Sequence, residues 1–392
     1  MILPQGHHLA YCTNIHPGET WAEVFASLQS HALAVRQQVA PGRPFALGLR
    51  LGARAVRDLE DARERLAFRR WLDLNQCYIF TLNGFPYGQF HQTRVKEDVY
   101  RPDWTTPERL EYTNRLFELL AEFLPPGIPG SVSTLPGSFK EFHPSPEARA
   151  LMRRHLWSAV THVARLSEQT GRDLHLGIEP EPLCLIETTT ETASLFDRIR
   201  AEHPGDPRID QHLGVNYDTC HMAVEFEEPG EALDRLLAHG IRISKIHLSS
   251  ALKVRPTAET RAALKAFTDP VYLHQTVIRQ ADGQRFIYRD LPDALARHPV
   301  ADSAAGDAGE EWRIHYHIPL HAPAAPPLEN TTDHLLGVLD RLQQTPGLCA
   351  HLEMETYTWD VLPAELKSQT VTEQLVQEYT WTLERLAERG LA

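Results

Sequence analysis

The chain has 392 residues, enough for one large domain or two smaller ones, and its composition is that of an ordinary globular protein. Its 52 acidic and 39 basic residues give a net charge of −13, which disfavours binding to nucleic acid or to an anionic membrane. No apolar run is long enough to span a membrane, and residues 1–8 lack the pattern of a signal peptide. We therefore expect a cytoplasmic protein without a membrane span, whose partner is a small-molecule metabolite.

Short β-like runs alternate with longer helical patterns along the chain. The eight runs are His8–His16, Phe45–Leu51, Cys77–Asn83, Gly130–Thr134, Leu174–Glu179, Leu213–Asp218, Ile243–Leu248 and Leu348–Thr356. The helical patterns lie at about 20–39, 53–72, 105–124, 145–170, 189–202, 229–239, 331–344 and 366–389. This alternation predicts an α/β fold and favours a (β/α)₈ or TIM barrel over an open sheet. We expect residues 1–392 to form a single barrel domain.

Two long insertions interrupt this alternation, at residues 84–103 after the third strand and at 251–312 after the seventh. In the second, the sequence predicts a helical stretch, Glu259–Phe267, and a hairpin with Asp282-Gly283 in its turn. Its stretch Ala301–Glu310 has the composition of a mobile loop. Both insertions follow the carboxyl ends of strands, where barrel enzymes build their active sites, so we expect them to shape a site.

Four consecutive strands end in metal-type donors on the same parity. Side chains alternate across a strand, and in each of these strands the apolar parity must face the helices while the small or polar parity faces the barrel interior. The polar parity ends in Glu179, Asp218, His247 and Glu355. One such residue could cap a helix or pair with an arginine, but three converging carboxylates repel one another without a cation. We therefore predict a bound divalent ion, with Mn²⁺, Zn²⁺, Co²⁺, Fe²⁺ and Mg²⁺ all compatible with the donors.

Further histidines follow in two motifs. His221 lies three residues after Asp218 in "DTCH", where it could bind a second metal, hold substrate or orient Asp218. The run "HYHIPLH" places His315, His317 and His321 on one parity, either as a second cluster with His317 deepest or as a solvent-exposed strand.

Candidate substrate contacts come from the earlier strands and the first insertion. They are His16, Arg50, Asn83 and His91, together with His317. Three of them have a structural alternative: His16 could be a satisfied buried polar residue, Arg50 could neutralise Glu179 or Glu355, and Asn83 could shape a turn. Glu181 and Glu353 share the inward parity, and we expect Glu353 to support the ligands from one pleat deeper.

Four motifs carry a resemblance to a known superfamily. "IEPEP" (Ile178–Pro182), "DTCHM" (Asp218–Met222), "KIHLS" (Lys245–Ser249) and "EMET" (Glu353–Thr356) look like the xylose isomerase-like barrels. These include sugar isomerases and epimerases, inosose-type dehydratases and endonuclease IV. The resemblance implies that Glu179, Asp218, His247 and Glu355 bind the metal.

Two details of these motifs bear on the reaction. Glu181 stands where xylose isomerases carry a catalytic lysine, which argues against aldose isomerisation by their route. "DTCH" is also similar to the form found in endonuclease IV, and this would make His221 a ligand. The acidic net charge fits a DNA substrate poorly.

Longer segments resemble the EboE-like "metabolite traffic" proteins of the bacterial ebo gene cluster. They are "YCTNIHPGE", "TLNGFPYGQFH", "VKEDVYRPDW", "YDTCH" and "HLEMETYTWDVLP". This resemblance implies work on a secreted or transported secondary metabolite beside other proteins of the cluster, and it defines no reaction.

Metal-dependent proton transfer on a polyhydroxylated or keto metabolite is the function we predict. Glu179, Glu355 and Glu181 are the groups placed to move the proton, and the product would be an epimer, an isomer or a dehydrated ketone. Two alternatives remain open: a non-catalytic carrier that binds the metabolite through the metal, and a phosphodiester hydrolase of the endonuclease IV type.

Overall fold

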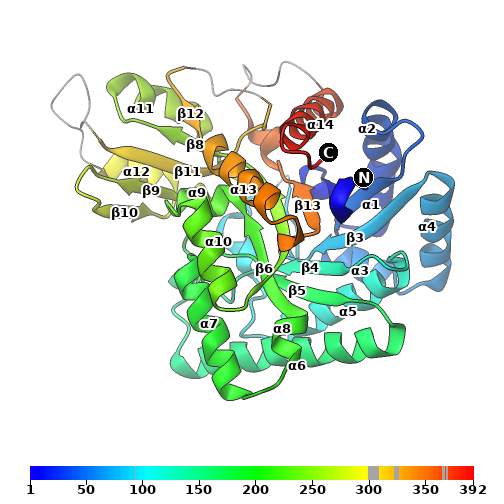
Figure 1. Ribbon diagram of the computed structural model, residues 1–392. Coiled ribbons are helices and arrows are strands. Elements are labelled where there is room, and N and C mark those ends of the chain that lie inside the picture. Colours follow the sequence, from blue (N-terminus) through cyan, green and yellow to red (C-terminus); the bar gives the residue numbers. More distant parts are fainter. Residues whose placement is uncertain (92, 299–308, 322–325, 364–366, 368–369) are drawn as a thin grey trace.

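A closed barrel of eight parallel strands forms the centre of the molecule (Figure 1). The computed structural model describes residues 1–91, 93–298, 309–321, 326–363, 367 and 370–392. The barrel strands, in the order β1-β13-β7-β6-β5-β4-β3-β2 around the ring, are β1 (His8–Cys12), β13 (His351–Met354), β7 (Arg242–Leu248), β6 (Leu213–Asp218), β5 (Leu174–Ile178), β4 (Gly130–Thr134), β3 (Cys77–Asn83) and β2 (Phe45–Arg50). The fold is therefore the α/β barrel that the alternation of strands and helices predicts.

Helices cover the outside of the barrel. They are α1 (Trp21–Ser27), α2 (Leu33–Val39), α3 (Ala53–Asp58), α4 (Ala62–Leu74), α5 (Pro107–Phe123), α6 (Pro146–Thr170), α7 (Thr189–Glu202), α8 (Arg208–His212), α9 (Thr219–Val224), α10 (Pro229–Ala238), α13 (Thr332–Gln344) and α14 (Val371–Ala387). Local signals set several of their ends: Thr188 and Glu191 form a capping box at the start of α7, and Gly171 ends α6 in the left-handed conformation. No helix in the described part of the chain combines the length and the apolar character that a membrane crossing requires.

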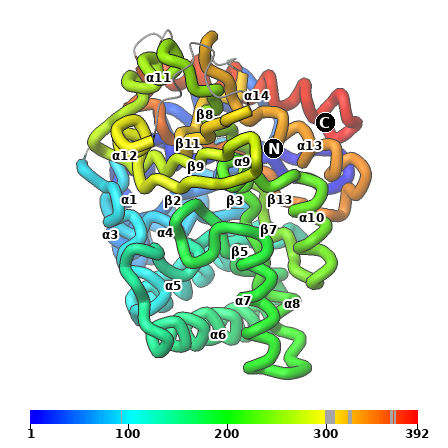
Figure 2. The backbone as a smooth tube through the Cα atoms, turned by 90° about the vertical axis from the view of Figure 1, so that its left-hand side faces the viewer, coloured from blue at the N-terminus to red at the C-terminus, as the bar shows by residue number. Residues whose placement is uncertain are grey.

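The second insertion builds an additional antiparallel sheet beside the barrel (Figure 1). Its strands follow the order β10-β9-β11-β8-β12, with β8 (Ala251–Val254), β9 (Thr276–Arg279), β10 (Arg285–Tyr288), β11 (Glu311–His317) and β12 (Glu329–Asn330). Two helices accompany it, α11 (Ala258–Leu264) and α12 (Leu291–Arg297). Turned by 90°, the molecule shows β9, β11 and α12 at one end and α6 at the other (Figure 2).

The predicted hairpin is present as β9 and β10, and the predicted extended run is β11. The structure adds that β11 pairs with β8, directly after the barrel strand β7. This pairing holds the carboxyl end of β11 beside the barrel mouth. Residues 301–308, most of the stretch expected to be mobile, lie outside the described residues. That residues 1–392 form one domain stays a prediction.

Small residues make room inside the barrel for long polar ones. A Cβ atom at Gly48 in β2 would lie 1.7 Å from Oε1 of Glu353, whose side chain extends across the barrel from β13. A similar space at Gly214 in β6 is occupied by Ser244, 2.4 Å from where the Cβ would stand. The long side chain of Glu353 thus fits inside the barrel because β2 carries glycine at position 48.

Candidate functional site

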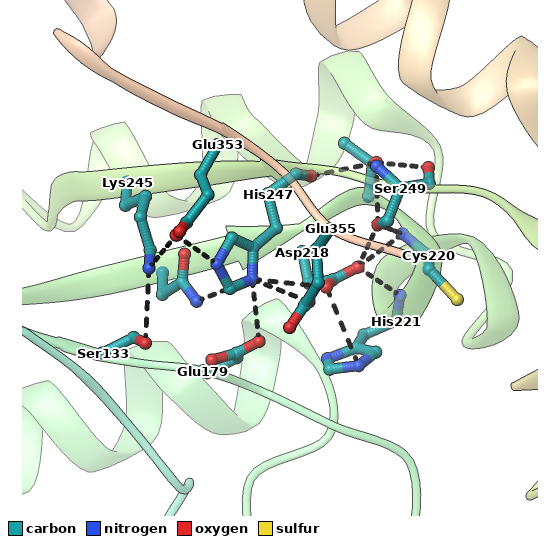
Figure 3. Close-up of polar contacts among 12 residues, drawn as sticks. Ser133, Glu179, Asp218, Cys220, His221, Lys245, His247, Ser249, Glu353 and Glu355 are labelled. Carbon is teal, nitrogen blue, oxygen red and sulfur yellow. Dashed lines mark hydrogen bonds and ion pairs between the residues drawn. The ribbon is translucent and has the colours of Figure 1, made fainter. Parts of the chain in front are cut away.

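Four donors converge at the carboxyl ends of β5, β6, β7 and β13. One ligand atom from each of Glu179, Asp218, His247 and Glu355 lies within 4.8 Å of the others, and all four side chains are buried. Nδ1 of His247 lies 3.1 Å from Oε1 of Glu179, 3.5 Å from Oδ2 of Asp218 and 3.0 Å from Oε2 of Glu355 (Figure 3). We call these four residues the carboxylate–histidine cluster. It is the set that strand parity places together.

A charged pair lies one pleat below the cluster. Glu353 contacts Nε2 of His247 through Oε2 at 2.9 Å, and the same oxygen accepts from Nζ of Lys245 at 2.6 Å (Figure 3). Lys245 also donates to Oδ1 of Asn83 at 2.6 Å, and Asn83 donates to Oε1 of Glu353 at 3.0 Å. Glu353 thus fixes the far nitrogen of His247 and leaves Nδ1 facing the other three donors, the arrangement expected of a residue that orients a ligand.

The "DTCH" motif lies where strand β6 ends and helix α9 begins. Asp218 ends β6 and also caps α9, because Oδ1 accepts from the backbone N–H groups of Cys220 at 2.7 Å and His221 at 3.2 Å. Ser249 donates to the same oxygen at 2.5 Å. The other oxygen, Oδ2, is buried and without a hydrogen-bond partner. An orphaned buried carboxylate oxygen that faces His247 fits a cation at this position.

The histidines and carboxylates of the cluster shift one another's pKa values. Burial opposes ionisation of Asp218, but His221, His247 and His317 outweigh it and hold the Asp218 pKa well below its usual range. Burial likewise opposes the charged form of His247, but Glu355 and Glu179 raise its pKa well above the ordinary value. The raised pKa of His247 and the lowered pKa of Asp218 both indicate that the cluster favours a positive charge among its carboxyl groups. A divalent cation can supply that charge, which is the second reason that these donors fit a metal.

A second group of donors adjoins the cluster. Ligand atoms of Asp218, His221 and His317 also lie within 4.8 Å of one another. Nε2 of His221 is 3.1 Å from Nε2 of His315, and Nε2 of His317 is buried without a partner. His315 and His317 are buried, so their alternative as part of a solvent-exposed strand is wrong.

Glu181 lies beside this second group, within hydrogen-bond reach of two neutral partners. Its Oε1 accepts from the hydroxyl of Tyr100 at 2.8 Å and from Nε2 of Gln275 at 3.1 Å. Burial raises the pKa of Glu181 to about 7, despite the opposing influence of His221. A carboxyl group with such a pKa can both accept and return a proton near neutral pH.

A pocket opens above the cluster and takes its walls from both insertions. Phe85, Phe90, Val95 and Val99 come from the first insertion, and Tyr272 comes from the second. Asn14, Asn83, Glu179, Glu181, His221, His315 and Glu355 form the polar part of the lining. The cavity volume open to the centre of a water molecule is about 60 Å³. One water needs roughly 10–15 Å³ of such volume, so the pocket has room for several waters. The insertions thus shape the site, as their place after strand ends predicts.

Among the predicted substrate contacts, Arg50, His16 and His91 have other partners. Arg50 forms an ion pair with Glu19 at 2.8 Å and donates to Gly18 and Gly88 carbonyls, so the alternative that it neutralises Glu179 or Glu355 is wrong. His16 stacks on His31 and contacts the Tyr11 hydroxyl. β1 ends at Cys12 and not at His16, so the inward alternation assumed for His16 does not hold.

His91 and Asn83 lie closer to the site. Nε2 of His91 contacts the carbonyl of Asn14 at 2.7 Å, and its Nδ1 contacts the Tyr272 hydroxyl at 2.8 Å. Asn14 in turn donates to Oε1 of Glu355 at 2.5 Å. His91 therefore lies behind the pocket wall, and Asn83 lines the pocket itself.

Four residues near the site were not expected from the sequence. Tyr100, Lys96 and Tyr357 line the pocket, and Gln275 bridges Glu181 and His315, donating to the first at 3.1 Å and contacting the second at 2.9 Å. Lys96 and Tyr100 lie in a 3-10 helix, Lys96–Tyr100, and Gln275 and Tyr357 lie outside helices and strands, so no strand parity applies to them. The available signal was position: Lys96, Tyr100 and Gln275 lie in the long insertions, and Tyr357 lies just after a barrel strand.

The barrel is similar in fold to solved TIM barrels, among them proteins described as xylose isomerase-like. A xylose isomerase-like TIM barrel protein from Mycobacterium smegmatis in complex with magnesium superposes with a TM-score of 0.54 at 13% identity, over 99% of each chain. A xylose isomerase domain protein from Planctomyces limnophilus gives 0.50 at 13% identity, over 91% of this chain and 92% of that one. An L-ribulose 3-epimerase gives 0.50 at 10% identity, over 99% and 96%. At such identities the likeness is one of fold. No protein-family model and no curated protein matches the sequence.

Proposed function

We propose that the protein is a divalent-metal-dependent isomerase or epimerase that moves a proton on a small hydroxy-carbonyl metabolite. The observation that carries the proposal is the carboxylate–histidine cluster at the floor of a pocket that also contains Glu181. Glu179, Asp218, His247 and Glu355 would hold the ion. Such an ion supplies Lewis acidity, which makes a proton next to a carbonyl easier to remove.

The chain's own residues account for the movement of the proton. Glu181 faces the pocket with a pKa of about 7, so a fraction of it is ionised at neutral pH and can take a proton from carbon. Tyr100 and Gln275 hold its Oε1 and fix its orientation. Delivery of a proton to the opposite face of the same carbon, by a second group such as Glu179 or Glu355, would give an epimer, and return of the proton by Glu181 to the neighbouring carbon would give an isomer.

Deuterium incorporation tests this proposal without knowledge of the natural substrate. The Mn²⁺-loaded protein is incubated with a panel of ketoses in D₂O, and NMR follows exchange at the carbons next to the carbonyl. We expect exchange that stops on chelation and falls at least a hundredfold in Glu181→Gln, with unchanged binding of the ketose. Glu187→Gln removes a buried carboxylate outside the pocket and is the matched control. Binding of a ketose without any exchange would contradict catalysis and favour the carrier alternative.

One observation favours a second candidate, metal-dependent hydrolysis of a phosphodiester. The second donor group of Asp218, His221 and His317 adjoins the cluster, and multinuclear sites stabilise both the attacking and the leaving oxygen in such reactions. Elemental analysis of the purified protein separates the candidates. Two or more tightly bound ions per chain, of which one is lost in His317→Ala, would support hydrolysis, whereas a single ion that persists in His317→Ala supports the isomerase.

We also propose that the metabolite belongs to secondary metabolism handled by the ebo gene cluster, with other ebo proteins as partners and the cytoplasm as location. Support for this comes from the sequence segments "YCTNIHPGE" and "HLEMETYTWDVLP". The test compares the metabolites exported by cells that carry either the natural chain or Asp218→Asn. Identical profiles would remove the proposal.

A further inference from the structure

The wall of the pocket is mainly apolar, in contrast to its floor. The side chains that form it are Phe85, Pro86, Phe90, Val95, Val99 and Leu273. An apolar surface contributes binding free energy only when it is covered by apolar atoms of the ligand. A free sugar, which carries a hydroxyl on nearly every carbon, has little to place against such a wall.

Three aromatic rings stiffen this wall. The ring centroids of Phe90, Tyr272 and Tyr357 lie 5.3 to 5.4 Å from one another in all three pairs. Val95 packs in the same buried cluster. Because the rings support one another, the wall is formed in advance and a ligand need not order it.

The one ammonium group on the wall has no hydrogen to offer a ligand. Nζ of Lys96 donates to the carbonyls of Asp269 at 2.9 Å and Tyr272 at 2.6 Å, and to Oδ2 of Asp290 at 2.6 Å. An ammonium group has three N–H donors, so all are used. Among the described residues that line the pocket there is no other lysine and no arginine. The sequence has no lysine and no arginine at the positions that the structure does not describe.

The tyrosine hydroxyls are engaged as well. The hydroxyl of Tyr100 donates to Glu181 and accepts from Gln275 at 2.7 Å. The hydroxyl of Tyr272 lies 2.8 Å from Nδ1 of His91. Few polar groups on the wall are therefore free to bind hydroxyl or phosphate groups of a ligand.

From these contacts we infer that the substrate is a neutral, two-ended molecule with a hydroxy-carbonyl end and an apolar arm. The reacting end meets Glu181 and the carboxylate–histidine cluster, which rests on the proposed function. The arm lies against the wall of Phe90, Val95 and Val99. A phosphate ester on the arm is disfavoured, since its charge would lie against the apolar wall, where the ammonium group of Lys96 is already engaged.

Three matched probes test the inference: D-fructose, 6-O-butyl-D-fructose and D-fructose 6-phosphate. Affinity is measured by calorimetry for the protein with and without Mn²⁺, so that binding is read independently of turnover. Each buried CH₂ group raises affinity about fourfold. We expect the butyl ether to bind more than about tenfold tighter than fructose, and the phosphate to bind more weakly than fructose. A butyl ether that binds no tighter than fructose, a preference for the phosphate, or no binding of any probe would overturn the inference.

A pair of variants assigns the effect to the wall. Val99→Asn makes this half-buried position polar, whereas Val99→Ile keeps it apolar, and thermal melting checks that both fold. The butyl advantage, taken as the ratio of the two affinities within each variant, should fall at least threefold in Val99→Asn and persist in Val99→Ile. An equal advantage in both variants contradicts contact with the wall. Tighter binding of the butyl ether without deuterium exchange would support the apolar arm and contradict the isomerase proposal. The two proposals are therefore tested independently.

Discussion

Glu353 contacts the Nε2 atom of His247 at 2.9 Å and thereby directs the opposite nitrogen, Nδ1, toward Glu179, Asp218 and Glu355. Lys245 stabilises the buried carboxylate of Glu353, because its ammonium group pairs with the same Glu353 oxygen at 2.6 Å. Burial opposes ionisation of Glu353, but Lys245 and His247 lower its pKa to about 2. The ionised carboxylate of Glu353 therefore supports the candidate ligands from one pleat below them.

Replacement of Glu353 by glutamine should weaken metal binding roughly 10–100-fold, the range typical for loss of a group that orients a ligand. The amide keeps the shape of the side chain but removes the charge that holds His247 and Lys245. Competition with a fluorescent chelator measures the metal affinity. Glu225→Gln, which removes another buried carboxylate paired with an arginine, is the control. Equal metal affinity in the natural protein and in Glu353→Gln would show that Glu353 does not orient His247.

Gly48→Ala should produce a similar defect from a different strand. The added Cβ would stand 1.7 Å from Oε1 and 2.6 Å from Cδ of Glu353, so the carboxylate must move. We expect weaker metal binding and a loss of stability of about 1–3 kcal/mol, as for other overpacked cores. Gly347→Ala is the matched control, because nothing lies within 4 Å of its added atom. Unfolding in urea and metal titration report the two effects. Unchanged metal affinity in a folded Gly48→Ala protein would contradict this account.

Metal removal should lower the melting temperature of the natural protein but not that of Asp218→Asn. A ligand that binds only the folded state stabilises it by about 2.7 kcal/mol at a free concentration one hundred times the dissociation constant. Asp218 supplies the orphaned oxygen Oδ2 to the cluster, and asparagine removes its charge. Scanning calorimetry with and without EDTA measures the shift. The exposed Asp340 serves as a control in Asp340→Asn, which should keep the full response. A shift of equal size in Asp218→Asn would place the ion elsewhere.

The sequence predicts the eight barrel strands and the convergence of Glu179, Asp218, His247 and Glu355 because both follow from a strict two-residue alternation. Strand parity is a local property, and the parallel barrel brings all strand ends to one face. The β9–β10 hairpin was predictable for a similar reason, since its turn residues are adjacent in sequence.

The remaining features depend on contacts between distant segments. The pairing of β8 with β11 joins residues on either side of the second insertion, and it is this pairing that brings His317 to the site. The ion pairs of Arg50 with Glu19 and of Lys96 with Asp290 join segments that are far apart in the sequence. No periodicity encodes such contacts, so the candidate ligands could be predicted but the pocket wall could not.

The contribution of Glu378 to stability should fall as the pH rises from about 4.5 to about 8. This residue of α14 is fully buried and accepts from Thr356 and Gln374, each at 3.1 Å. Burial raises its pKa to about 8, against 4.5 for an ordinary glutamate. Between these values the folded protein holds a proton that the unfolded chain releases. The stabilisation from the raised pKa is therefore complete below pH 4.5 and is lost as the pH passes through 8.

Glu378→Gln isolates this contribution, because glutamine cannot ionise and keeps the shape of the protonated acid. We expect the variant to match the natural protein at pH 5 and to exceed it at pH 8.5 by on the order of 3–5 kcal/mol. Urea unfolding in the presence of EDTA gives the two free energies, since chelation removes any contribution from metal. Glu384→Gln, on an exposed position of the same helix, should show no such dependence. A difference between Glu378→Gln and the natural protein that is the same at both pH values would mean that Glu378 is ionised in the folded state throughout this range.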